Sequence, residues 1–286
     1  MNVIDRLKTG AVLTKDSLLL MRHHPKLVLF PIVSGIAGLG FLVLFLGVTF
    51  GLAAISPEGG VLVGLLLVYL VLTFVSSFFT AGLVHQTREV LAGGEVSLSA
   101  GIAAAWDRKT PIFVWSLIAA TIGVIINGIE NSDSRAGRLF GSLFSVAWTL
   151  MTFFIIPVIV FERTSTAEMF KRSAGRFKQT YGETPISLLG IQFISVIVVL
   201  PFALAGIYLF SIGVAAIGIG LVLLGVLSSF LVSQTLGGVV KTTLYLYAKE
   251  GTKPGEFDDV DFDRLNENGG AAGARPTRGA TSGGFQ

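Results

Sequence analysis

The chain has 286 residues, of which 52% are hydrophobic and only 14% are charged, against about 25% charged in soluble domains. So few charges exclude a water-soluble domain of ordinary surface. The absence of cysteine excludes disulfides, thiol catalysis and cysteine-containing zinc and iron–sulfur sites. With only three histidines, two of them adjacent, the sequence also does not favour a histidine-built metal centre. We expect no metal and no cofactor.

Six apolar stretches follow one another along the chain, and none contains Asp, Glu, Lys or Arg. A helix needs about 20 residues to cross the ~30 Å hydrocarbon core of a bilayer. Each stretch therefore predicts a membrane-spanning helix, and Pro31, Pro157 and Pro201 inside them predict kinks. The predicted spans are residues 27–55, 61–84, 112–129, 139–161, 186–210 and 212–240.

The basic residues lie almost entirely on one side of these spans. Nineteen of the 21 Lys and Arg residues fall before the first span, in the second and fourth connections and after the last span. The positive-inside rule then places both termini in the cytoplasm. We expect a multi-pass plasma-membrane protein, and the basic balance needs no nucleic-acid partner to explain it.

A charged helix precedes each pair of spans, followed each time by a proline. The clearest begins with a capping box formed by Ser165 and Glu168. An apolar stripe then runs from Phe170 to Tyr181, flanked by cations, which suits the headgroup region of an anionic leaflet. The first helix carries a weaker basic face, and a third, poorly periodic one ends near Asp107. The candidate lipid-headgroup contacts are Lys8, Lys15, Arg22, Lys171, Arg172, Arg176 and Lys178.

These elements predict an all-α fold, a polytopic membrane helix bundle. Its six transmembrane helices form three hairpins, each preceded by a cytoplasmic amphipathic helix. We expect residues 1–250 to form this domain. Residues 251–286 are acidic and then rich in Gly, Ala, Arg and Thr, so we expect a disordered cytoplasmic tail.

The spans hold no acid–base pair that could catalyse a reaction. The sequence also contains no nucleophile elbow, zinc-protease motif or phosphate-binding loop, so we do not expect an enzyme. The polar side chains inside the spans are neutral. They include a candidate intramembrane cluster of Asn127, Gln192, Ser233 and Gln234. Hydrogen bonding between helices explains such residues as well as a solute path does.

The stretch from His24 to Pro31, Ser34-Gly35 and the later Ser173, Phe177, Thr180, Tyr181 and Gly182 carry a family resemblance. Together they resemble an uncharacterised family of prokaryotic six-helix membrane proteins, over roughly residues 2–250. The layout is also similar to membrane domains that accompany some glycerophosphodiester phosphodiesterases. The resemblance implies a plasma-membrane protein and no activity.

Two functions fit these patterns. The first is a non-enzymatic membrane-organising or complex-scaffolding protein that binds anionic lipid at its cytoplasmic face, alone or with a second copy or another membrane protein as partner. The alternative is a passive transporter or channel for a small apolar or amphiphilic solute.

Overall fold

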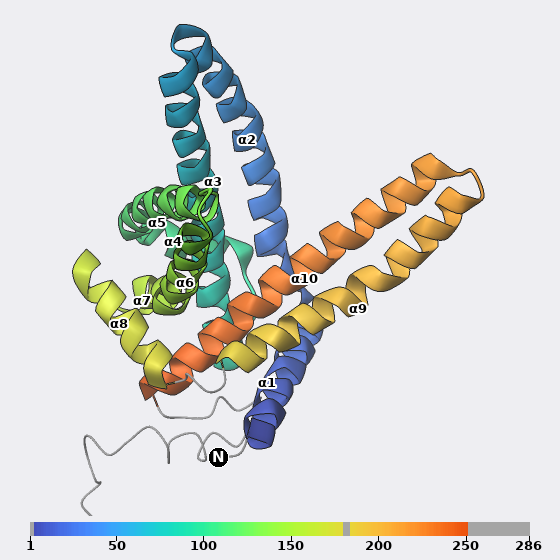
Figure 1. The fold of residues 1–286 in the computed structure, drawn as a ribbon. Helices are drawn as coiled ribbons and strands as arrows, with labels where there is room; N and C mark the ends of the chain where they lie inside the picture. Colours follow the sequence, from blue (N-terminus) through green and yellow to red (C-terminus); the bar gives the residue numbers. More distant parts are fainter. Residues whose placement is uncertain (1–2, 180–183, 251–286) are drawn as a thin grey trace, which may run out of the picture.

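The computed structural model describes residues 3–179 and 184–250, and the side chains of residues 13–178 and 190–249. The described chain is helical throughout apart from turns, which confirms the all-α prediction (Figure 1). The predicted tail, 251–286, lies outside the described residues. The helices are α1 (Val3–His23), a 3-10 helix η1 (Pro25–Val28), α2 (Leu29–Ile55), α3 (Pro57–Leu91), α4 (Leu98–Asp107), α5 (Lys109–Glu130), α6 (Arg135–Thr152), α7 (Ile155–Phe161), α8 (Thr166–Gln179), α9 (Thr184–Ser211) and α10 (Ala215–Glu250).

Within the described residues, six helical segments are long and apolar enough to cross a bilayer. They match the six predicted spans in order and number, and the protein is a multi-pass membrane protein. The segments are Pro25–Ile55, Pro57–Leu91, Lys109–Glu130, Arg135–Phe161, Gly190–Ser211 and Ala215–Lys249.

The long helices lie side by side in the pairs α2 with α3, α5 with α6 and α9 with α10. The α2–α3 and α9–α10 pairs extend in different directions from the region where α3 and α10 meet, which we call the base (Figure 1). Away from the base their large apolar side chains are exposed, as with Ile36, Phe50, Ile207 and Leu223. Such surfaces suit contact with lipid chains.

Glycine allows the helices within two of these pairs to approach closely. At Gly60 and Gly64, a Cβ atom would collide with the backbone of Leu52 and the side chain of Thr49. Gly206 and Gly218 meet in the same way between α9 and α10. A larger residue at any of these positions would push the two helices of the pair apart.

The buried core lies at the base, where the ends of α3 and α10 meet α1, α4, α7 and α8. Both long helices continue past the predicted spans, α3 to Leu91 and α10 to Glu250. The extension of α10 is mostly buried, and the extension of α3 buries Gln86, Thr87 and Val90, unlike the outer halves of the same helices. The largest fully buried side chains include Leu20, Leu27, Phe30, Ile112, Phe154, Leu244 and Tyr245.

The three prolines behave differently from one another. Pro31 lies in the first turn of α2, where a missing N–H costs nothing, so no kink is needed there. Pro201 stays inside the continuous α9. The predicted kink at Pro157 is instead a break, because the fourth span divides into α6 and α7 at Phe153 and Phe154. Proline cannot donate a hydrogen bond back to the preceding turn, which favours a break at this point.

A side chain from α8 closes this break. The hydroxyl of Ser173, which is fully buried, accepts a hydrogen bond from the backbone N–H of Phe154 at 3.1 Å. The same hydroxyl donates to the carbonyl of Met151 at 2.7 Å. One buried hydroxyl therefore satisfies two backbone groups that the helix leaves unpaired.

Ser173→Ala is expected to lower the free energy of unfolding by about 1–3 kcal/mol, because a buried N–H and a carbonyl lose their partner. Thermal unfolding of the purified protein in detergent micelles measures this. Ser142→Ala is the matched control, since the exposed Ser142 hydroxyl donates to the carbonyl of Arg138, one turn back in its own helix. Equal stability of the two variants would contradict the conclusion that the Ser173 hydroxyl stabilises the break between α6 and α7.

Candidate functional site

The helix α8 packs against the protein core with its apolar face. Met169 and Phe177 are buried, and Phe170 packs near the rings of Trp115 and Trp148, with ring centres 6.0 and 5.9 Å away. The sequence predicts this stripe in the lipid headgroup region, whereas the structure directs it into protein. The reason is the break at Phe153 and Phe154, which opens a surface that the stripe fills.

The predicted capping box at the start of α8 is partly formed. The Ser165 hydroxyl accepts a hydrogen bond from the backbone N–H of Glu168 at 3.4 Å. The Glu168 carboxylate pairs with Arg172, one turn later, at 2.6 Å. This glutamate therefore links the start of α8 to a larger charge network.

The centre of that network is Glu162, which directly follows α7 and whose side chain is 5% exposed. Its carboxylate accepts hydrogen bonds from the hydroxyl of Tyr245 and from the guanidinium of Arg172. The guanidinium of Arg176 lies 3.9 Å from the Glu162 carboxylate and donates to the carbonyl of Ala248 at 2.9 Å. The network thus fastens the ends of α7, α8 and α10 together.

Burial by itself would raise the pKa of Glu162. The hydrogen bonds from Tyr245 and Arg172 and the nearby positive charges outweigh it, and hold the pKa below its ordinary value. The hydrogen bonds to Glu162 and Glu168 raise the pKa of Arg172. Glu162 is therefore an ionised carboxylate whose charge is already matched by arginine.

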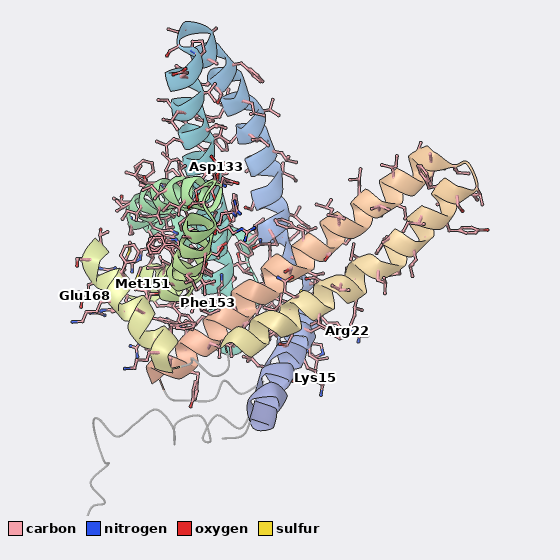
Figure 2. The ribbon with its side chains drawn as sticks, viewed as in Figure 1. Lys15, Arg22, Asp133, Met151, Phe153 and Glu168 are labelled. Atoms are coloured by element: carbon pink, nitrogen blue, oxygen red, sulfur yellow. The ribbon has the colours of Figure 1, made fainter. Side chains whose placement is uncertain are left out.

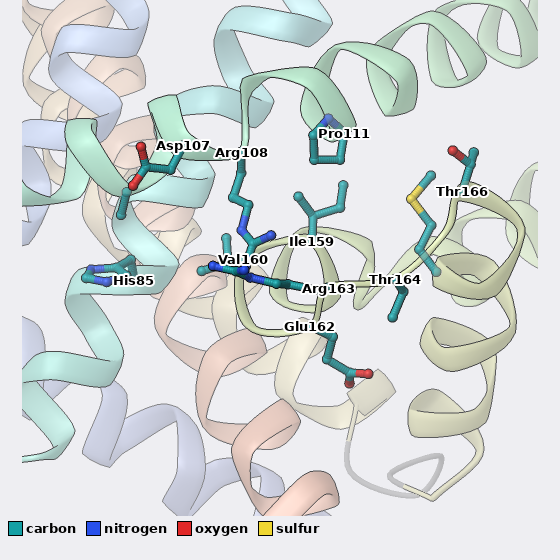
Figure 3. A pocket seen from close by; sticks show the side chains of 12 residues that line it. His85, Asp107, Arg108, Pro111, Ile159, Val160, Glu162, Arg163, Thr164 and Thr166 are labelled. Carbon is teal, nitrogen blue, oxygen red and sulfur yellow. The ribbon is translucent and has the colours of Figure 1, made fainter.

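Beside this network lies a half-open cavity of about 640 Å³ (Figure 3). Its walls come from the end of α3, the junction between α4 and α5, and the segment that joins α7 to α8. The lining residues are His85, Ala104, Asp107, Arg108, Pro111, Ile159, Val160, Glu162, Arg163, Thr164, Thr166 and Met169. Among the described residues, no group of three or more His, Asp or Glu side chains is placed to hold a metal ion.

The candidate lipid contacts fall into two groups. Lys15 and Arg22 are exposed on α1, at the opposite end of the molecule from the α2–α3 turn (Figure 2). Lys171 and Lys178 are exposed on α8. The remaining three are Arg172 and Arg176, which belong to the Glu162 network, and Lys8, whose side chain lies outside those described.

The candidate polar cluster is spread over different surfaces. Asn127 lines a cavity of about 360 Å³ with Tyr69, Thr73, Glu130 and Trp148 among others. Gln234 lines another, of about 170 Å³, beside Phe30 and Ser76. Gln192 is exposed on α9 and Ser233 is half-buried on α10. The four side chains do not line one common cavity among those described.

Sequence reasoning missed both the Glu162 network and the neighbouring cavity. Glu162 and Tyr245 are 83 positions apart, and no periodic pattern connects them. One signal was present, since Glu162 is the only acidic residue directly bordering a predicted span end on the basic side. We expect a carboxylate at the end of a membrane span to be paired with a cation and to have a functional or structural role.

The sequence profile of one family, described as a family of unknown function (DUF6159), matches residues 59–255. The match covers more than half of the chain and all of the residues that form the network and the cavity. The protein belongs to the DUF6159 family. Comparison with curated proteins and with solved structures gives no match. The resemblance to membrane domains of glycerophosphodiester phosphodiesterases stays a prediction.

Of the residues that carried the sequence resemblance, Ser173 and Phe177 lie inside the DUF6159 match, and the stretch from His24 to Pro31 lies before it. Thr180, Tyr181 and Gly182 fall within the matched range but outside the described residues. In the structure, Ser173 seals the α6–α7 break and Phe177 is buried in the core. These two positions of the motif therefore belong to the packed base of the molecule.

Proposed function

We propose that this DUF6159 protein is a non-enzymatic membrane-organising or complex-scaffolding protein of the plasma membrane, and that it binds anionic lipid at its cytoplasmic face. The three helix pairs cross the bilayer as hairpins. The helices α1, α4 and α8 lie on the cytoplasmic side with both termini, since nineteen of the 21 Lys and Arg residues are on that side.

The observation that carries this proposal is that the basic helices bury their apolar side chains in the core and expose their cations. On α1, Leu13, Ser17 and Leu20 are buried while Lys15 and Arg22 are exposed. On α8, likewise, Met169 and Phe177 are buried while Lys171 and Lys178 are exposed. Cations held on a rigid base beside spans that lack charge attract anionic headgroups, at about 1 kcal/mol per residue near the surface.

Native mass spectrometry of the full chain, purified in a mild detergent with equal phosphatidylglycerol and phosphatidylcholine, tests the proposal. We expect phosphatidylglycerol adducts to dominate, and K171Q/K178Q to reduce them. The matched control is R135Q/R138Q, which removes two charges at the opposite ends of the spans. Equal adducts of the two lipids on the unmodified protein would contradict anionic-lipid binding.

The alternative, passive transport of a small amphiphilic solute, rests on one specific observation. The cavity that contains Asn127 lies between α3, α5 and α6, inside the candidate spans, and has polar side chains in its wall. Release of a small amphiphilic dye from proteoliposomes, slowed by Asn127→Leu, would support this function. Release no faster than from protein-free liposomes would remove it.

A further inference from the structure

Two arginines, Arg108 and Arg163, line the half-open cavity of about 640 Å³. Arg108 lies at the junction of α4 and α5, and Arg163 follows α7. Both line the cavity, and in the view of Figure 3 their side chains extend into the same part of it. Among the described residues, neither forms an ion pair.

The acidic residues in the same wall do not neutralise them. Glu162 already binds Arg172 and Tyr245, and its carboxylate points away from Arg108 and Arg163 (Figure 3). Asp107 is exposed and makes no ion pair within the described part of the chain. Arg108 is half-buried and Arg163 is exposed, so water weakens the repulsion between their two charges, and an anion bound between them would remove it.

The chemistry of the wall favours a phosphate group among anions. A guanidinium presents paired N–H donors that match two phosphate oxygens, and two arginines can hold one phosphate from two sides. His85 and the hydroxyl-bearing Thr164 and Thr166 add further polar groups.

The position of the cavity indicates where that phosphate comes from. His85 directly follows the second predicted span, Pro111 directly precedes the third, and Glu162 directly follows the fourth. The cavity therefore lies at the depth where these spans meet the headgroup region. Its wall also includes the apolar side chains of Ile159 and Val160, beside the arginines. A phospholipid placed here could keep its phosphate on the arginines and its glycerol against this apolar wall.

We propose that the cavity lined by Arg108 and Arg163 is a binding site for a phosphate group, and that it takes the headgroup of an anionic phospholipid. The proposal deepens the proposed function and rests on it for the placement in the membrane. It assigns one defined lipid site in addition to the exposed cations of α1 and α8, which attract lipid without a cavity.

The test uses the full chain in a mild non-ionic detergent and isothermal titration with three probes. They are inorganic phosphate, short-chain phosphatidylglycerol and short-chain phosphatidylcholine. We expect one saturable site for phosphatidylglycerol and weaker binding of inorganic phosphate. Arg108→Gln and Arg163→Gln should each weaken both by about tenfold, the effect expected when a charged hydrogen-bonding group is lost.

Two further variants separate the cavity from the rest of the surface. Ala104→Trp places a large side chain in the cavity wall and keeps both arginines, so it should block the site even if an arginine variant fails to fold. Arg135→Gln, at the opposite ends of the spans, is the control and should leave the titration unchanged. Thermal unfolding of every variant reports whether it is folded.

The outcomes distinguish this proposal from the one on which it rests. Undiminished phosphatidylglycerol binding in folded R108Q, R163Q and A104W overturns the cavity site. If K171Q/K178Q then abolishes that binding, the broader lipid-binding proposal stands. Binding of inorganic phosphate that depends on both arginines, with no preference for phosphatidylglycerol over phosphatidylcholine, supports a phosphate site and overturns its assignment to lipid. No binding of any probe overturns both proposals.

Discussion

Phe30→Ala is expected to lower the free energy of unfolding by about 3–5 kcal/mol, the usual range for a large aromatic side chain lost from a packed core. Phe30 is 1% exposed and lies where the start of α2 meets α3 and α4. A Cβ atom at Gly82 or Gly101 would lie within 3 Å of its ring. The ring therefore fills a space that two glycines leave open, and alanine would leave a cavity there.

The loss does not depend on water, because a void in a protein core forfeits van der Waals contacts whether the surroundings are lipid or solvent. Thermal unfolding in detergent micelles measures it. Phe50→Ala is the matched control, with the same substitution on the same helix at a side chain that is 74% exposed. A similar fall in both variants would show that the base is no better packed than the lipid-facing surface.

Glu162→Ala is expected to destabilise the base of the molecule, because three elements lose their shared acceptor. The buried Tyr245 hydroxyl is left without a partner, which by itself costs about 1–3 kcal/mol. The charges of Arg172 and Arg176 lose the carboxylate that they face. We expect the junction of α7, α8 and α10 to open first, with faster amide exchange at these helix ends.

The control for Glu162 is Glu168→Gln. Glu168 pairs with the same Arg172, but its side chain is 46% exposed, and exposed ion pairs contribute about 0–1 kcal/mol. Glu162→Gln separates charge from shape, since an amide can still accept from Tyr245. If Glu162→Ala and Glu168→Gln unfold at the same temperature, the Glu162 network contributes no more to stability than an exposed ion pair does.

The same carboxylate gives the protein an acid sensitivity. Because the pKa of Glu162 in the folded protein lies below its ordinary value of 4.5, the ionised form stabilises the fold. That contribution is fully present above about pH 4.5 and is lost as the pH falls through the lowered value. Glu162→Gln should remove this part of the acid dependence from the thermal unfolding temperature, leaving whatever other carboxylates contribute.

The spans could be predicted because lipid imposes a local rule. A crossing helix must be apolar for about 20 residues whatever it packs against, so the runs around Leu39, Leu66 or Val222 indicate membrane helices without any knowledge of their neighbours. The closure of α3 at Gly93, which has a φ of +82°, is also local, because glycine adopts this conformation without strain.

The base could not be predicted, because its contacts join residues far apart in sequence. The pattern around Phe170 and Phe177 has the period of an amphipathic helix, but periodicity does not tell whether lipid or protein covers the apolar face. Ser173 is one polar residue in that pattern, and its role depends on a helix break at Phe154 in another element. Arg108 and Arg163 likewise share a cavity only after α4, α5 and α7 have packed.

Labelling of single cysteines in intact cells with a membrane-impermeant maleimide tests the orientation most directly, since the chain has no cysteine of its own. We predict that Glu58→Cys, in the first turn of α3, is labelled from outside. Ala100→Cys on α4 and Gly175→Cys on α8 should be labelled only after the membrane is permeabilised. Ready labelling at positions 100 and 175 in intact cells, with position 58 protected, would contradict the cytoplasmic placement of the basic helices and of the cavity.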